Sequence, residues 1–117
     1  RASTAEALGA RLLASPEVTG DVRDRIDAIV RDMNTIMLDA ERTMTSQLVR
    51  LDPSRDLMSV IHQPDGTIQK QHARRHAASE AAITQMLDAL PPALRESHAS
   101  WVASALSARG GDLLPDP

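Results

Sequence analysis

Two histidines, His72 and His76, stand four residues apart in a stretch whose composition favours helix. Residues at this spacing lie one above the other on a helix, so the two imidazoles can bind one metal ion together. Zn, Ni and Cu accept such ligands. Because two ligands do not complete a site, the pattern predicts a metal centre only if other side chains join the pair.

The further ligands that the sequence offers are His98, Met86, Glu80 and His62. Arg74 and Arg75 lie between the two histidines and would repel a cation if they turned inward. No acidic residue stands one turn before His72 to orient its ring. The alternative is that His72 and His76 are partly exposed residues at a seam between helices.

Other catalytic patterns are missing from the chain. The carboxylates near the start of the longest predicted helix alternate with arginines, which is typical of a solvated surface. The sequence has no cysteine, no glycine-rich phosphate loop and no nucleophile paired with a base. The five methionines are interpreted as gap-fillers in a core without rings. We therefore do not expect an enzyme.

The composition predicts an all-α fold. Trp101 is the only aromatic residue among 117, and the apolar residues are otherwise Ala, Leu, Ile, Val and Met. Helices favour this set, whereas sheets use β-branched and aromatic residues. A core without large rings is thin, so we expect a homodimer or another bound protein to complete it. The net charge of −3 speaks against nucleic-acid binding.

Helix start and stop signals predict a single helical domain over 1–109 and a flexible tail over 110–117. Ser3 and Glu6 have the spacing of a capping box. Thr67 is the expected cap of a later helix. The predicted helices are 3–15, a long one starting at 16 or only at 21 and ending near 51, a short one over 53–62, then 68–90 and 91–109. Because the two long helices are expected to run antiparallel, the architecture is an elongated helical hairpin or a four-helix bundle.

Apolar residues at steps of three or four define one face of each predicted helix. The long second helix has Val22, Ile26, Ile29, Met33, Ile36, Ala40, Met44, Leu48 and Leu51. The face of the 68–90 helix has Ile68, His72, Ser79, Ile83, Met86, Leu87 and Leu90. The last helix has Leu94, His98, Trp101, Val102, Ala105 and Leu106. Trp101 is expected to anchor this helix on the hairpin, or else to be an exposed interface residue.

The stretch "QMLDALPPALRESHASWVASAL" follows a long amphipathic helix and opens a shorter one at Leu90-Pro91-Pro92-Ala93-Leu94. This layout resembles the bacterial periplasmic family of helical-hairpin stress chaperones and heavy-metal sensor domains. The Thr, Glu and Gln of the family motif are absent here. The resemblance implies an extended dimer that holds unfolded clients, or senses Ni, Co or Cu through ligands such as His72, His76, His98 and Met86. The family's metal-binding histidines tend to lie early in the chain, where this sequence has none.

The sequence thus predicts a non-enzymatic helical module for protein interaction, with a sensor or chaperone-like role. One alternative is a metal-binding sensor domain that uses His72 and His76. Another is a dimerisation or docking module excised from a larger protein, since the chain begins at Arg1 and not at Met. A removed signal peptide or a membrane anchor is compatible with that start, and the resemblance favours the periplasm over the cytoplasm.

Overall fold

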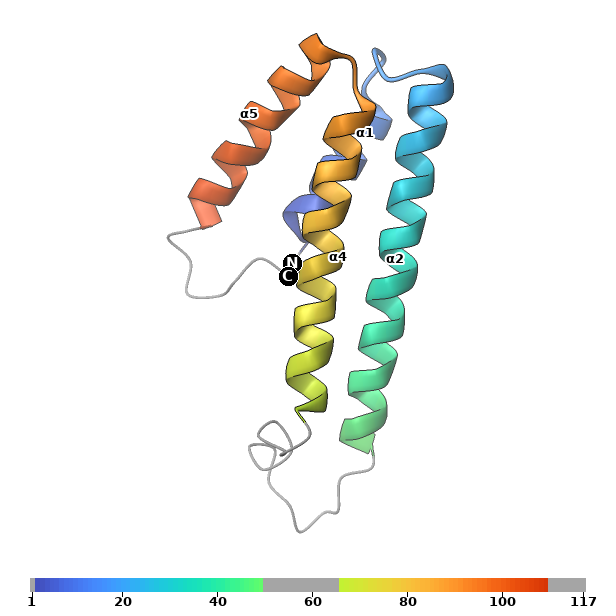
Figure 1. Cartoon of the computed structure of the whole chain (residues 1–117), viewed down its shortest axis with the longest axis vertical. Coiled ribbons are helices and arrows are strands. Elements are labelled where there is room, and N and C mark those ends of the chain that lie inside the picture. Colours follow the sequence, from blue (N-terminus) through green and yellow to red (C-terminus); the bar gives the residue numbers. More distant parts are fainter. Residues whose placement is uncertain (1, 50–65, 110–117) are drawn as a thin grey trace.

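The computed structural model describes residues 2–49 and 66–109, which form four helices and contain no strand (Figure 1). The helices are α1 (Thr4–Ala14), α2 (Gly20–Val49), α4 (Thr67–Ala89) and α5 (Pro92–Arg109). The predicted all-α fold is confirmed. The predicted short helix over 53–62 and the tail over 110–117 lie outside the described residues.

Helix α1 begins with the predicted capping box. The Oγ atom of Ser3 accepts a hydrogen bond from the Glu6 backbone N–H at 3.0 Å, and Glu6 Oε2 accepts one from the Ser3 N–H at 3.3 Å. Two of the unpaired N–H groups of the first turn are thereby satisfied. The helix ends at Ala14, and the next does not start at Pro16. It starts at Gly20, whose φ of +57° is a conformation that glycine adopts readily. Of the two predicted starts, 16 and 21, the later one therefore differs from the observed start by one residue.

Helix α4 is capped one residue earlier than the sequence predicts. Gly66 is the N-cap, with a φ of +63°, and Thr67 is the first helical residue, so the prediction of Thr67 as the cap is wrong. Glycine adopts the left-handed conformation without steric penalty, which allows the chain to turn sharply into the helix. The Gly66 carbonyl then accepts the first helical hydrogen bond, from the Lys70 N–H at 2.8 Å.

The turn between α4 and α5 is closed by Arg95, which comes from the first turn of α5. Its Nε donates to the Leu87 carbonyl at 3.0 Å, and its Nη2 donates to the Leu90 carbonyl at 2.9 Å. The last carbonyls of a helix have no partner within that helix. Arg95 therefore completes the hydrogen bonding at the C-terminal end of α4, where a cation also suits the helix dipole.

The two long helices, α2 and α4, run antiparallel as a hairpin, as predicted, in a molecule 56 × 30 × 20 Å across (Figure 1). Helix α1 lies against one side of this hairpin, over its upper half in the view shown. Helix α5 contacts α1 and the end of α4, and it diverges from α4 toward its own C-terminal end (Figure 1). In the described residues, no helix combines the length and apolar character needed to cross a membrane.

The core lies where α1, α2 and α4 meet. Leu8 and Leu12 of α1 are fully buried there with Ile26 of α2 and Met86 of α4. Burying a side chain of this size contributes about 1.5–3 kcal/mol. Helix α1 approaches α2 so closely at Gly9 that a Cβ atom would lie 2.7 Å from Val30 Cγ2. The methionines at positions 33, 37 and 86 are all buried, which confirms their interpretation as core residues.

The buried faces differ from the predicted stripes at two places. On α2, Met37 is buried and Ile36 only half-buried, because α1 widens the buried face on the side of Val30 and Met37. On α4, the buried face includes Ala82, and His72 is exposed, so its predicted place on the apolar face is wrong. The cause is that α1 reaches only the upper half of the hairpin (Figure 1), whereas His72 lies in the second turn of α4, which begins at Thr67 at the lower end.

Candidate interaction surface

The structure does not bring the four predicted metal ligands together. His72 and His76 are both exposed on α4, and His76 Nε2 lies 3.1 Å from Glu80 Oε1, one turn further on. Met86 is fully buried in the core, ten residues beyond His76 or about 15 Å along the helix axis. His98 is buried on α5. A four-ligand site of these residues is therefore not assembled.

Residues 2–49 and 66–109 contain no group of three or more His, Asp or Glu side chains that could hold a metal ion. The fourth histidine of the chain, His62, lies outside these ranges. Metal binding by the exposed pair His72 and His76 stays a prediction.

His98 takes part in a contact that fastens α5 to α1. Arg11 Nε donates a hydrogen bond to His98 Nδ1 at 3.2 Å, and the Arg11 guanidinium carbon lies 5.1 Å from the centre of the Trp101 ring. Such a cation–π contact contributes about 0.5–1 kcal/mol at an exposed site. Trp101 packs against the buried core as well as against Arg11, so it helps to anchor α5 on the rest of the molecule.

The environment of His98 favours its neutral form. Burial lowers the pKa of the imidazole below 6.5, and the nearby charge of Arg11 lowers it further, while Glu17 acts in the opposite direction. Because Nδ1 accepts a hydrogen bond, the proton of the neutral ring sits on Nε2. His98 therefore serves as an acceptor between two helices, with one ring nitrogen already occupied.

A shallow groove runs between α2 and α4. It encloses about 220 Å³ and is lined by Ile29, Asp32, Met33 and Ile36 of α2, and by Ala78, Ala81, Ala82 and Gln85 of α4. Pockets for small molecules usually hold about 300–1,000 Å³ and surround their ligand. This groove is smaller and open along its length, so its shape suits the side chains of another helix better than an enclosed ligand.

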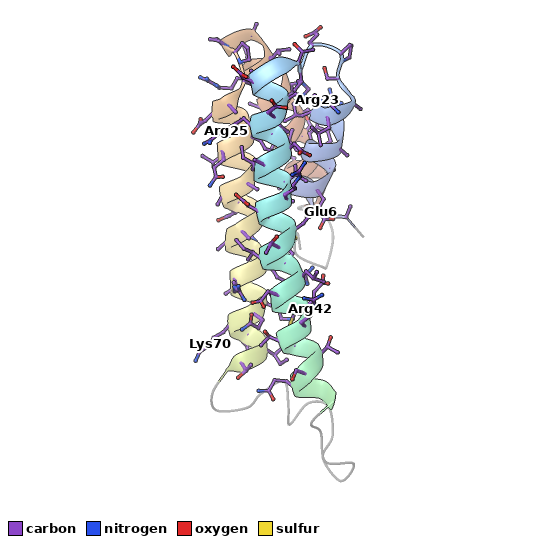
Figure 2. The ribbon with its side chains drawn as sticks, turned by 90° about the vertical axis from the view of Figure 1, so that its right-hand side faces the viewer. Glu6, Arg23, Arg25, Arg42 and Lys70 are labelled. Atoms are coloured by element: carbon purple, nitrogen blue, oxygen red, sulfur yellow. The ribbon has the colours of Figure 1, made fainter. Side chains whose placement is uncertain are left out.

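The groove lies on the side of the hairpin that α1 does not cover. Figure 2 shows Arg25 on the opposite side of α2 from Arg23 and from Glu6 of α1. Asp32 follows Arg25 by seven residues, or two helical turns, and therefore shares its side of α2. We call this side the groove face. Its residues are Arg25, Ile29, Asp32, Ile36 and Asp39 of α2, and Arg74, Ala77, Ala78, Ala81, Gln85 and Asp88 of α4.

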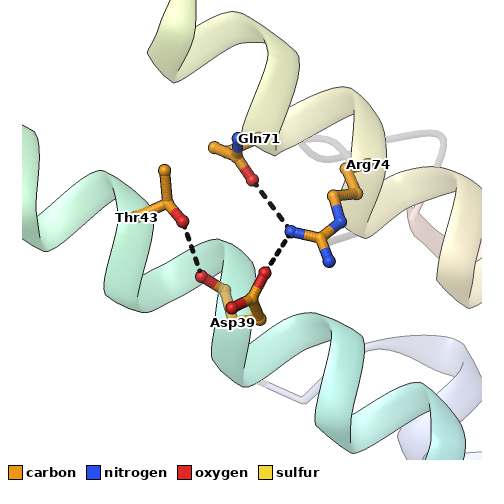
Figure 3. Close-up of polar contacts among 4 residues, drawn as sticks. All are labelled: Asp39, Thr43, Gln71 and Arg74. Atoms are coloured by element: carbon orange, nitrogen blue, oxygen red, sulfur yellow. Dashed lines mark hydrogen bonds and ion pairs between the residues drawn. The ribbon is translucent and has the colours of Figure 1, made fainter.

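An ion pair crosses the lower part of the groove face (Figure 3). Arg74 Nη1 lies 2.5 Å from Asp39 Oδ2 and 3.4 Å from Gln71 Oε1. Thr43 Oγ1 donates to the Asp39 carbonyl at 3.0 Å, one turn along α2. Because the pair is exposed, it contributes less than about 1 kcal/mol. Its main value here is that it defines the register, with Asp39 of α2 level with Arg74 of α4.

The same register sets a second pair of opposite charges level with each other. Arg25 precedes Asp39 by fourteen residues, and Asp88 follows Arg74 by fourteen. Since the helices are antiparallel, Arg25 and Asp88 stand at the same height near the upper end of the groove face. Both are exposed, and neither has an ion-pair partner in the part of the chain that the structure describes. These two charges are available to a partner.

Comparison with known proteins finds no family model that matches the chain, and no match among curated proteins or solved structures. The likeness to helical-hairpin chaperones and metal sensors therefore stays a prediction.

The groove face is the feature that the sequence interpretation missed. The signal was present in the alanines at 77, 78, 81 and 82, which place a smooth strip on one side of α4. Because alanine is the strongest helix former, these alanines could equally have been present for helix stability alone, and the sequence did not identify them as a binding surface. Only the packing of α1 on the other side of the hairpin shows that the strip is left open.

Proposed function

We propose that this chain is a non-enzymatic helical module that works by binding protein, and that it binds through the groove face. The observation that supports this most directly is the open groove beside Ala78 and Ala81, with charges at Arg25 and Asp88 that have no ion-pair partner in the described residues. Apolar area excludes water when a partner docks, and charges at the rim select and orient that partner.

The chemistry of the groove face agrees with binding and not with catalysis. Its charged groups, among them Asp32 and Asp39, are exposed at the rim of a shallow depression. Acid–base catalysis uses groups that converge on one point and are shielded from water, so that their pKa values are shifted. A sensor and a chaperone-like protein both act through contacts of the kind proposed here.

Site-specific photo-crosslinking tests the proposal. A photoreactive amino acid is placed at Ala81, in the groove, and in a matched variant at Ala103, an exposed alanine of α5. Both variants are produced in the cells from which the chain derives, and both are irradiated. We expect protein adducts from position 81 that are at least about tenfold more abundant than those from position 103.

The size of the adduct separates the outcomes. One discrete adduct from position 81, whether with a second copy or with another protein, supports binding through the groove face. Equal and diffuse labelling from both positions would overturn the proposal. Circular dichroism of the two purified variants checks that each keeps the helical fold, so that a negative result reflects the surface and not unfolding.

A further inference from the structure

We propose that the occupant of the groove face is a second copy of this chain. The two copies are related by a two-fold axis parallel to the hairpin, so that α2 of each copy lies on α4 of the other. This inference rests on the proposed function, and it names the partner. The two hairpins together then form a four-helix bundle, with α1 and α5 of each copy on the outside.

The shapes of the two helices complement each other under this symmetry. Helix α2 presents a large side chain at Ile36, which is half-buried within one chain. Helix α4 presents small ones at Ala77 and Ala78, level with Ile36 in the register set by Asp39 and Arg74. The two-fold axis places the isoleucine of one copy over the alanines of the other. Ridges on one helix then fill the groove of its partner, as in close helix packing.

The charges are complementary in the same arrangement. Going down the hairpin, α2 has Arg25 and then Asp39, whereas α4 has Asp88 and then Arg74. The order of the signs is therefore opposite on the two helices. When α2 lies on α4 of the second copy, Arg25 faces the Asp88 of that copy, and Asp39 faces its Arg74. Arg25 and Asp88, which have no ion-pair partner within the described part of one chain, thus gain one in the dimer.

Asp32 selects this arrangement over the antiparallel one. A two-fold axis perpendicular to the hairpin would place α2 on α2, and it would also bring Arg25 opposite Asp39. However, Asp32 lies midway between these two residues, so each Asp32 would then face its own copy, and like charges in contact are unfavourable. In the proposed arrangement Asp32 faces the region of Ala81 and Gln85, where the amide of Gln85 can donate a hydrogen bond to it.

The size of the groove face is sufficient for a stable dimer. Helix α4 has 23 residues and is about 35 Å long. Two helices side by side, each about 10 Å wide, give each copy a face of about 700 Å². Two such faces bury about 1,400 Å² in total, which is within the usual range of about 1,200–2,000 Å² for specific complexes.

Charge reversal followed by sedimentation equilibrium tests the arrangement. The wild-type chain is compared with Arg25→Glu, with Asp88→Lys, and with the double variant that has both changes. We expect the wild type to be dimeric at micromolar concentration. Each single reversal creates two like-charge contacts across the two-fold axis and raises the dissociation constant at least about tenfold. The double variant restores opposite charges and returns to within about threefold of the wild type.

The double variant distinguishes the two symmetries. In the antiparallel dimer the glutamate introduced at position 25 would face Asp39, so the double variant would stay weak, and that result would overturn the parallel arrangement. A second pair of variants tests the face itself. Ala81→Lys fills the groove and should abolish the dimer, whereas Ala103→Lys, on α5, should leave it unchanged. All the substituted positions are exposed, and circular dichroism verifies that each variant is folded.

Failure of this inference differs from failure of the proposed function. If the wild-type chain stays monomeric at several hundred micromolar, the proposal that a second copy occupies the groove face is overturned. If position 81 then still crosslinks to one other protein in cells, the groove face remains a binding surface with a different partner. If position 81 yields no specific adduct either, both proposals fall.

Discussion

The seam between α2 and α4 and the corner between α1 and α5 hold helices together in different ways. The seam is made of apolar side chains repeated at helical spacing, such as Ile29, Met33 and Ala82. Two ion pairs cross its lower half, Arg74–Asp39 and Arg75–Glu41. At the corner, α5 adds Val102 to the buried core, and the directional contacts come from one arginine, Arg11, which lies against the Trp101 ring and donates to the buried His98.

This difference shows where the fold is robust and where it responds to conditions. Apolar contacts are non-directional, and losing one atom leaves the others in place, so the seam tolerates small changes. The corner needs a neutral His98 and one guanidinium at the correct distance and angle. We therefore expect the seam to determine the free energy of unfolding, and the corner to determine how firmly α5 is attached.

The largest effect is expected in the core beside the seam. Met86→Ala removes a fully buried side chain that lies against α1, so it should lower the free energy of unfolding by about 2–5 kcal/mol. Urea unfolding followed by circular dichroism at 222 nm measures the change. The matched control is Leu38→Ala, at an exposed residue of α2, which should change the value by less than about 0.5 kcal/mol. Equal losses in the two variants would show that Met86 is not a core residue.

The close approach of α1 to α2 gives a smaller effect whose sign depends on the partner. Gly9→Ala places a methyl group 2.7 Å from Val30 Cγ2, and overpacking of this kind costs about 1–3 kcal/mol. The gain in helix propensity is about 1 kcal/mol, so a net loss of about 0–2 kcal/mol is expected.

The same substitution in a Val30→Ala background has room for the new methyl group, and it should be neutral or stabilising by up to about 1 kcal/mol. A double-mutant cycle in urea measures both backgrounds. If Gly9→Ala has the same effect in each, the contact with Val30 does not limit the approach of the two helices.

The corner should respond to pH. The pKa of His98 is lowered by folding, so the unfolded chain binds a proton at a higher pH than the folded chain does. The contribution of His98 to stability is therefore fully present above pH 6.5 and declines as the pH falls below it. Trp101 fluorescence during urea unfolding at pH 7.5, 6.5 and 5.5 follows this decline, because the indole lies in the same contact.

His98→Gln should remove this part of the pH dependence, since glutamine can still accept from Arg11 but does not titrate in this range. Ala103→Gln is the matched control at an exposed residue of the same helix, and it should leave the pH dependence as it is in the wild type. If His98→Gln leaves the profile unchanged as well, the corner is not the pH-sensitive region.

The smallest effect belongs to the exposed ion pair between Asp39 and Arg74, one of the two that cross the seam. The side chains of Asp39 and Arg74 are 60% and 43% exposed, so Asp39→Asn should cost less than about 1 kcal/mol. The loss should shrink further in 1 M NaCl, which screens surface charges. Urea unfolding at low protein concentration, with and without salt, measures it in the single chain. A loss above about 2 kcal/mol would show that the seam also depends on specific polar contacts.

The sequence predicted the elements better than their contacts. The capping box at Ser3 and the breaks near Gly20 and Pro92 are local signals, and local signals act within one or two turns of helix. Thr67 was predicted as the N-cap because threonine side chains accept hydrogen bonds from a helix N-terminus. The N-cap is instead Gly66, because the chain enters the helix in the left-handed conformation, which glycine adopts readily. The predicted helices were therefore correct to within one or two residues at most described ends.

The candidate site was less predictable because it depends on which side of the hairpin is covered. His72 fits the apolar period of α4, yet it is exposed because α1 stops above it. His98 was considered as a ligand, but α1 brings Arg11 to it across 87 positions of sequence. A local sequence pattern cannot predict a contact between residues that are so far apart in the sequence. The groove face is open for the same reason, since it is defined by the absence of α1 from one side.

The clasp that Arg95 makes on the carbonyls of Leu87 and Leu90 also determines how α5 can leave the rest of the molecule. Separation of the first turn of α5 from α4 would break the hydrogen bonds that Arg95 donates to the carbonyls of Leu87 and Leu90. If the Arg11 contact opens while the Arg95 hydrogen bonds persist, α5 would pivot at its N-terminal end, and the residues near its C-terminal end, among them Leu106, which is 42% exposed, would be displaced most.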